Sequence, residues 1–239
     1  MRWGSFGAVH ITTLILAAAV IAGIYFALRK APKKVQITVL GILSFSGIAA
    51  IVFNLLAWDE PLQYLPLHLC SINAMLLPFV VFTRNKTLGN LLLVWCLGAL
   101  VAIVLNFEMV NVKLYSWTFF FYYFPHVMEF GIPVLLFKLG LVEKDWRQIG
   151  PTMGITMAIY SCIHTANCLI NRLTDEQVNY MFSVEPSNPL VALFYKVIPY
   201  DYWYMYMVLP IVLVYLLIVY APQIASHIKK NKVHRKVEV

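Results

Sequence analysis

Long apolar runs alternate with short polar segments along this chain. Each run holds about 17–24 residues, the length that an α-helix needs to cross the hydrocarbon core of a bilayer, whereas barrel strands are shorter. The pattern predicts an all-α, polytopic membrane bundle of about seven transmembrane helices. We expect these at Phe6–Leu28, Val35–Trp58, Leu65–Phe82, Thr87–Leu105, Phe119–Leu139, Arg147–Ile170 and Tyr202–Tyr220.

Proline positions predict where some of these helices begin, bend or end. Pro66 fits the first turn of the third span, because proline is tolerated there. Pro78, Pro133 and Pro210 lie further inside their spans and should kink or end them. The one long connection, residues 171–201, is typical of a lid, a binding loop or a disordered segment.

Composition indicates that the chain needs lipid around it. Hydrophobic residues make up 61% of the 239 residues and charged residues only 12%, and the mean hydropathy is +0.76. A soluble domain carries roughly 25% charged residues. The net charge of +7 resides in short loops and the tail, so we expect no nucleic-acid partner. We interpret residues 1–225 as a single transmembrane domain and residues 226–239 as a basic cytoplasmic tail.

Lysine and arginine are concentrated in every second loop and in the tail. Cytoplasmic loops carry this excess, so the pattern predicts the N-terminus outside and the C-terminus inside, as seven spans also require. We expect the tail to contact anionic lipid headgroups. The basic residues of these loops and of the tail are Arg29, Lys30, Lys33, Lys34, Arg84, Lys86, Lys138, Lys144, Arg147, Lys229, Lys230, Lys232, Arg235 and Lys236.

Polar side chains from several spans should lie near the outer face. Ionisable groups inside a membrane are costly and by default suggest a function. This topology brings four of the six histidines, each from a different span, to a similar depth. The set comprises His10, His68, Cys70, Asn106, Glu108, His126, Glu129, His164 and Asn167.

Three chemistries could use this cluster, and residue spacing alone leaves all three open. Cys70 could be a nucleophile that a histidine activates. Three histidines could hold a catalytic zinc ion, although no HExxH-like spacing supports it. The cluster could instead bind a substrate or carry protons in a transporter.

Individual residues of the cluster also have simpler interpretations. Glu129 follows His126 by three residues, so it shares a helical face and could orient the imidazole. His164 and Asn167 are typical of hydrogen bonds between membrane helices. Cys70 could also form a disulfide with Cys168 on the oxidising side of the membrane.

Several motifs give the chain a family resemblance. The stretch Leu65–Cys70, LPLHLC, resembles the LPLHxC signature of the YwaF-like integral membrane proteins, bacterial relatives of the transmembrane protein 164 acyltransferase family. Departures are His126-Val127 where the family often has His-Gly, and Gln177-Val178 where it often has Gly-Thr. Further similar segments are Val9-His10, Trp95–Gly98, Phe124–His126, Asn179–Phe182 and Pro199–Tyr204.

The resemblance implies a lipid acyltransferase or acyl hydrolase that needs no cofactor or bound metal, with a membrane lipid as its substrate. Carried over to this chain, it implies that Cys70 attacks an acyl ester and that His126 is the general base. The residues expected to support the site or bind substrate are His10, His68, Glu129, Asn179 and Tyr180.

Overall fold

The computed structural model describes residues 1–106 and 109–237, with side chains described as far as Lys229. Glu108 and the end of the basic tail therefore lie outside the described residues. The described residues form helices joined by turns and loops, and their only β-type pairing is one isolated bridge between Arg2 and Lys113. Its helices are α1 (Ala8–Leu28), α2 (Lys33–Ser44), α3 (Ser46–Ala57), α4 (Leu69–Thr83), α5 (Lys86–Leu105), α6 (Trp117–Lys138), α7 (Ile149–Leu173), α8 (Pro189–Val197) and α9 (Val208–Val237).

The predicted polytopic helical bundle is confirmed. Within the described ranges, six helical segments are long and apolar enough to cross a membrane. One of them combines α2 and α3, which are separated only at Phe45. The predicted span at residues 65–82 corresponds to α4, an apolar helix of 15 residues that is shorter than the other spans.

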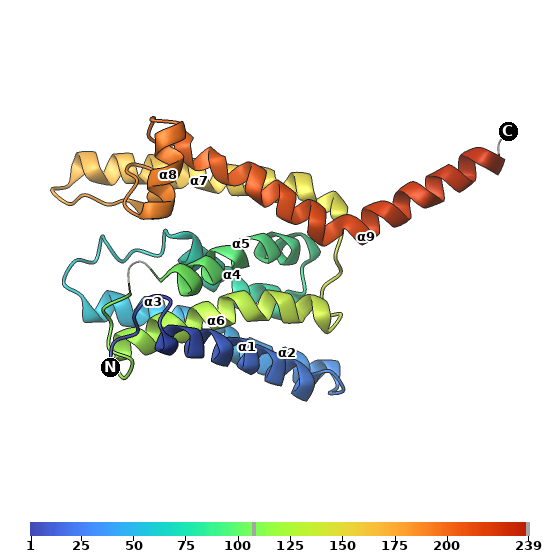
Figure 1. Ribbon diagram of the computed structural model, residues 1–239, viewed down its shortest axis with the longest axis horizontal. Helices are drawn as coiled ribbons and strands as arrows, with labels where there is room; N and C mark the ends of the chain where they lie inside the picture. Colours follow the sequence, from blue (N-terminus) through green and yellow to red (C-terminus); the bar gives the residue numbers. More distant parts are fainter. Residues whose placement is uncertain (107–108, 238–239) are drawn as a thin grey trace.

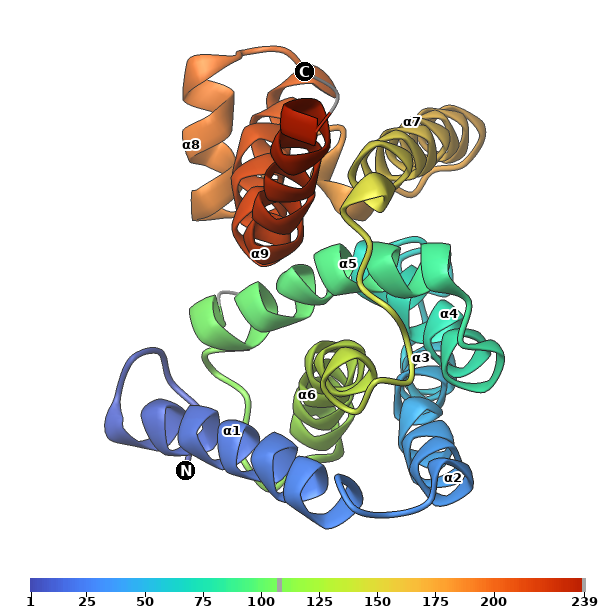
Figure 2. The ribbon, with the colours of Figure 1, turned by 90° about the vertical axis from the view of Figure 1, so that its right-hand side faces the viewer.

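Helix α6 forms the axis of the larger part of the bundle. Helices α1 to α5 all contact it, and Figure 2 shows them curving around it. Helices α7, α8 and α9 lie on the opposite side of α5 (Figure 2). Both faces of α5 are therefore covered, and residues 89–96 of this helix are buried without interruption.

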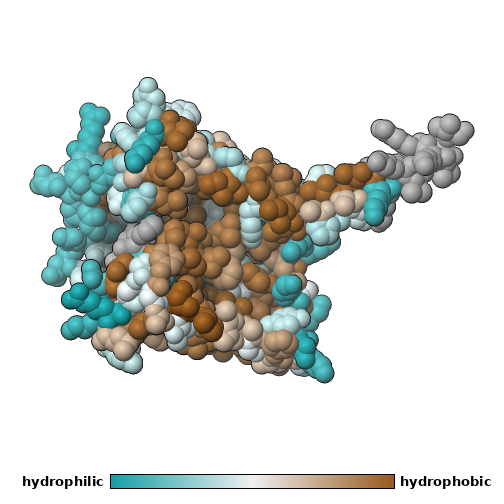
Figure 3. Space-filling view, viewed as in Figure 1, coloured by the Kyte–Doolittle hydropathy of each residue, from teal (hydrophilic) through white to brown (hydrophobic). Residues whose placement is uncertain are grey.

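The two ends of the bundle differ from its middle. Figure 3 shows a broad hydrophobic band with hydrophilic residues gathered at both ends, as a bilayer requires. The α1–α2, α4–α5 and α6–α7 connections all lie at the end where α9 leaves the bundle, whereas the N-terminus lies at the other end (Figure 1). The basic loops of the sequence thus share one end.

The structure corrects several expectations about helix boundaries. Pro66 lies before α4 rather than in its first turn. Pro78 and Pro133 do not end their helices, which continue past them, and Pro210 is the third residue of α9, so bending at these prolines stays a prediction. Helix α7 runs three residues beyond the predicted Ile170. The segment 171–201 is ordered by two elements of its own, the 3₁₀ turn η2 (Tyr180–Phe182) and α8.

Candidate functional site

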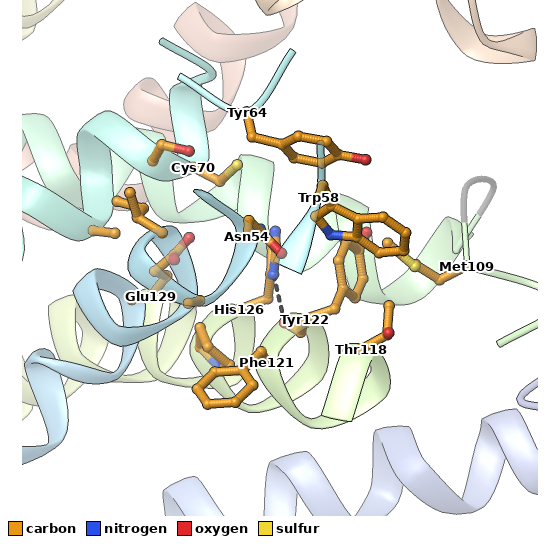
Figure 4. A pocket seen from close by; sticks show the side chains of 16 residues that line it. Asn54, Trp58, Tyr64, Cys70, Met109, Thr118, Phe121, Tyr122, His126 and Glu129 are labelled. Atoms are coloured by element: carbon orange, nitrogen blue, oxygen red, sulfur yellow. Dashed lines mark hydrogen bonds between the residues drawn. The ribbon is translucent and has the colours of Figure 1, made fainter. Parts of the chain in front are cut away.

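A cavity of about 140 Å³ lies between α3, α4 and α6. Small residues of α3 and α4 leave room for it, and aromatic rings of α6 and of the α3–α4 connection cover it (Figure 4). Its lining residues are Gly47, Ala50, Ile51, Asn54, Trp58, Tyr64, Cys70, Ser71, Ala74, Met109, Thr118, Phe121, Tyr122, Pro125, His126 and Glu129.

Cys70 is the second residue of α4. The helix begins there because His68 has an extended backbone and its carbonyl accepts the first helical hydrogen bond, from the Ile72 N–H at 3.0 Å. In the first turn of a helix the backbone N–H groups point toward the helix start, which carries a partial positive charge. The positive end of α4 therefore favours negative charge on the Cys70 sulfur.

His126 reaches the same cavity from the middle of α6. Its Nδ1–H donates to the Tyr122 carbonyl oxygen at 2.7 Å, and its ring packs at 4.4 Å from the Tyr122 ring (Figure 4). A carbonyl can only accept, so the neutral ring carries its proton on Nδ1. The Nε2 atom then has the lone pair that a general base uses.

Glu129 follows one turn further along α6. Its side chain is only 3% exposed, and its Oε2 atom is buried with no hydrogen-bond partner among the described residues. A Cβ atom on Gly47 would approach Ala74 to 2.5 Å and Glu129 Oε1 to 3.2 Å. Only glycine at position 47 therefore leaves space for this carboxyl group between α3 and α4.

His68 is not among the residues that line the cavity, and the long outer connection contacts its ring. Its Nδ1 accepts a hydrogen bond from the Met181 N–H at 3.4 Å, and its ring meets the Tyr180 ring edge-on at 5.4 Å. Burial lowers the pKa of His68 to about 4, so the imidazole is neutral at pH 7. The two motifs LPLHLC and NYMF therefore meet in space at His68.

Helix α7 holds the NYMF segment in place through two asparagines. Asn167 donates to the Tyr180 carbonyl and accepts from the Tyr180 N–H, and Asn171 makes the same pair of bonds with Val178. The Tyr180 hydroxyl in turn donates to the Leu62 carbonyl. The segment thus links α7 to the connection that leads into α4 and Cys70.

The remaining predicted residues organise other parts of the outer end. His10 is fully buried, where its Nδ1 accepts from the Phe6 N–H and its Nε2 donates to the Ile103 carbonyl. Asn179 bonds the backbone of the turn at residues 184–185. His164 and Asn167 both bond Ser183, so their hydrogen bonds join a helix to a loop.

Of the seven predicted site residues, the structure brings three to one cavity: Cys70, His126 and Glu129. Sequence reasoning missed Asn54, whose side chain lines that cavity (Figure 4). An amide inside an otherwise apolar span was the signal that could have identified it.

The arrangement bears on two of the alternatives left open by the sequence. Cys70 and Cys168 are both thiols rather than a disulfide. Among the side chains that the structure describes, those of residues 1–106 and 109–229, no three His, Cys, Asp or Glu groups lie closely enough together to hold a metal ion. The four histidines that were expected at a similar depth each form a hydrogen bond with a different partner.

Comparison with known proteins identifies one family. The family model that describes the TMEM164 family matches residues 5–220, which is most of the chain. The match includes the cavity, the outer connection and all helices up to the middle of α9. No curated protein and no solved structure matches the chain.

Proposed function

We propose, from the premise that this chain belongs to the TMEM164 family, that it is a membrane-embedded lipid acyltransferase or acyl hydrolase of the YwaF-like bacterial group. The observation that carries this proposal is the shared cavity of Cys70 and His126. A thiol at a helix start and an imidazole with a basic Nε2 atom are the two groups that thiol acyl transfer needs.

The first half-reaction forms a thioester on Cys70. His126 Nε2 removes the thiol proton as the sulfur attacks the carbonyl carbon of a lipid ester. The tetrahedral intermediate collapses, the ester C–O bond breaks, and the imidazolium returns its proton to the leaving alkoxide. The Nδ1 bond to the Tyr122 carbonyl keeps the ring oriented throughout.

The second half-reaction releases the acyl group. His126 removes a proton from an acceptor hydroxyl, or from water, and the resulting oxygen nucleophile attacks the thioester. The C–S bond breaks and the imidazolium protonates the leaving sulfur. An acceptor lipid gives acyl transfer and water gives hydrolysis, so the residues that admit the acceptor decide between the two outcomes.

The negative oxygen of both intermediates needs hydrogen-bond donors. The first-turn N–H groups of α4 adjoin Cys70, and the Asn54 amide lines the same cavity. We assign the oxyanion to these groups. His68 and Asn179, which we expected to support the site or bind substrate, are outside the lining and bond the outer connection instead.

Two other functions remain as alternatives. A non-catalytic lipid or small-molecule carrier would use the same cavity for binding, without needing the Cys70 thiol. A zinc hydrolase is less favoured by the described residues, since they offer no three-ligand group. Binding of anionic headgroups by the basic tail also stays a prediction.

Activity-based labelling of the purified protein in lipid tests the proposal. The probes are a thiol-directed acyl probe and a fluorophosphonate, and the variants are Cys70→Ala, His126→Ala and, as a control, Cys168→Ala. We expect Cys70 in the wild type and in Cys168→Ala to be labelled by the acyl probe, and both other variants to lose the label. Absent labelling, or labelling of Cys70 that does not need His126, would refute the pair and favour a carrier.

A further inference from the structure

We infer that Glu129 takes part in the reaction as a neutral carboxylic acid, which donates a hydrogen bond to the reacting ester group. This inference rests on the proposed acyl chemistry, because it assigns a role to the third ionisable side chain of the Cys70–His126 cavity.

The first step concerns the charge of the carboxyl group. Glu129 is buried between helices of an apolar bundle, and its Oε2 atom has no hydrogen-bond partner among the residues described. No lysine or arginine appears among the described lining residues of the cavity. An ionised carboxylate without a cation or donors costs several kcal/mol to bury, so such a group takes up a proton instead.

The second step concerns the groups that face this carboxyl. The other titratable side chains of the lining are Tyr64, Cys70, Tyr122 and His126. None of them is a permanent cation, and His126 already donates its Nδ1 proton to a backbone carbonyl. The described lining therefore offers no permanent cation to offset a negative charge on Glu129 before the reaction begins.

The third step is the consequence of the added proton. A protonated carboxyl has an O–H donor, whereas a carboxylate can only accept. Figure 4 shows the Glu129 carboxyl, the Cys70 thiol and the His126 ring around the same space. An O–H group there can bond to the carbonyl oxygen as negative charge develops on it, and this supplements the donors at the start of α4.

Two competing roles require the opposite charge. Glu129 could hold the His126 imidazolium, or it could bind a cationic group of the substrate, and each role needs a carboxylate. Glutamine has the shape of glutamic acid and an N–H donor but no negative charge. The variant Glu129→Gln therefore preserves a neutral donor and abolishes both anionic roles.

The experiment compares Glu129→Gln and Glu129→Ala with the wild type for Cys70 labelling rate and for turnover. We expect Glu129→Gln to keep activity within about threefold and Glu129→Ala to lose about 10²–10³-fold in kcat, the usual effect of deleting one oxyanion donor. A Glu129→Gln variant as inactive as Glu129→Ala, with both still folded, would overturn the inference. So would full activity of Glu129→Ala.

A second measurement separates this inference from the proposed function. Infrared spectroscopy of the protein at neutral pH should show the carbonyl stretch of a protonated carboxyl that Glu129→Gln removes. Absence of that band overturns the inference, whatever Cys70 does. A wild-type protein that never labels at Cys70 refutes the proposed function, and with it the catalytic use of the proton, even if the band is present.

Discussion

Cys70 comes from α4, and His126 and Glu129 come from α6, yet all three line one cavity. The surrounding backbone determines the charge, the proton position or the space available to each of these side chains. The start of α4 faces Cys70, the Tyr122 carbonyl fixes the proton on His126, and the missing side chain of Gly47 makes room for Glu129.

Acidification should loosen the outer connection at His68. The pKa of His68 is lowered by burial from 6.5 to about 4, so the folded loop binds a proton less readily than the opened loop. Its stability is full above pH 6.5 and falls as the pH drops toward 4, by up to about 3 kcal/mol. The protection factors for hydrogen exchange at residues 178–183, which are corrected for the pH dependence of the intrinsic exchange rate, should fall over this range.

The variant His68→Asn provides the control for this effect, because it cannot titrate. Its protection factors at residues 178–183 should change little between pH 6.5 and 4. An identical pH response in the variant and in the wild type would show that another group is responsible.

Gly47→Ala should destabilise the helix pair that encloses the cavity. The added Cβ would lie 2.5 Å from the Ala74 Cβ atom, which is too close for either backbone to accept without moving. We expect a loss of about 1–3 kcal/mol, the usual cost of overpacking, seen as a lower midpoint of thermal unfolding in detergent. Gly154→Ala on α7 is the matched control, since no atom lies within 4 Å of its added Cβ.

Single residues also show where sequence reasoning reached its limit. Cys70, His126 and Glu129 could be predicted because the spans put them at a similar depth and because the family resemblance singled out Cys70 and His126. Asn179 and His68 belong to motifs as well, but they support backbone rather than the cavity. A motif indicates that a residue has a role, but it does not say which role. Only the fold distinguishes a side chain that lines a site from one that holds a loop in place.

At the scale of elements, hydrogen bonds between α7 and the NYMF segment hold the outer connection in place. Two asparagines, Asn167 and Asn171, each bond both the N–H and the C=O of one loop residue, in the manner of an added strand. They are four residues apart, so they occupy one face of α7. The loop is thereby held over His68.

Asn167→Ala should release this loop. Asn167 is fully buried, and its loss leaves the N–H and C=O of Tyr180 without their partners, at about 1–3 kcal/mol for each buried group. We expect faster proteolysis between residues 171 and 188 and slower labelling of Cys70. Thr165→Ala is the control on the same helix, because its hydroxyl is exposed and bonds only the preceding turn. Equal proteolysis of both variants would contradict the role given to Asn167.

The helices themselves were largely predictable, since apolar length is a strong signal. The break between α2 and α3 at Phe45 was not predictable, because no proline stands there. The start of α4 at Leu69, later than expected, was not predictable either. The order within residues 171–201 also escaped prediction. It depends on partners such as Asn167 and Leu62, which are distant in sequence or hidden within an apolar span.

At the scale of the whole molecule, the basic connections gather at one end of the bundle and the N-terminus lies at the other (Figure 1). The positive-inside rule applied to this arrangement keeps the prediction that the N-terminus is outside. Apolar length and charge bias are both whole-chain properties. They therefore indicated the bundle and its orientation without knowledge of any contact.

Thiol labelling can test the orientation in a background whose four native cysteines are replaced by alanine. A membrane-impermeant maleimide applied to intact cells should label Glu185→Cys in the outer connection. It should label Lys34→Cys only after permeabilisation. Both positions are exposed in the protein, so accessibility alone cannot explain a difference. The reverse pattern would invert the topology.

The cavity holds about 140 Å³, close to the ~150 Å³ that accommodates one benzene-sized molecule in another protein. An ester group and a few adjoining methylenes fit that space, but a full acyl chain does not. The rest of the chain must then lie outside the cavity, among the helices and the bilayer. The proposed enzyme would therefore not select its substrate by acyl-chain length. It would recognise the ester and the atoms next to it, and accept acyl chains of many lengths.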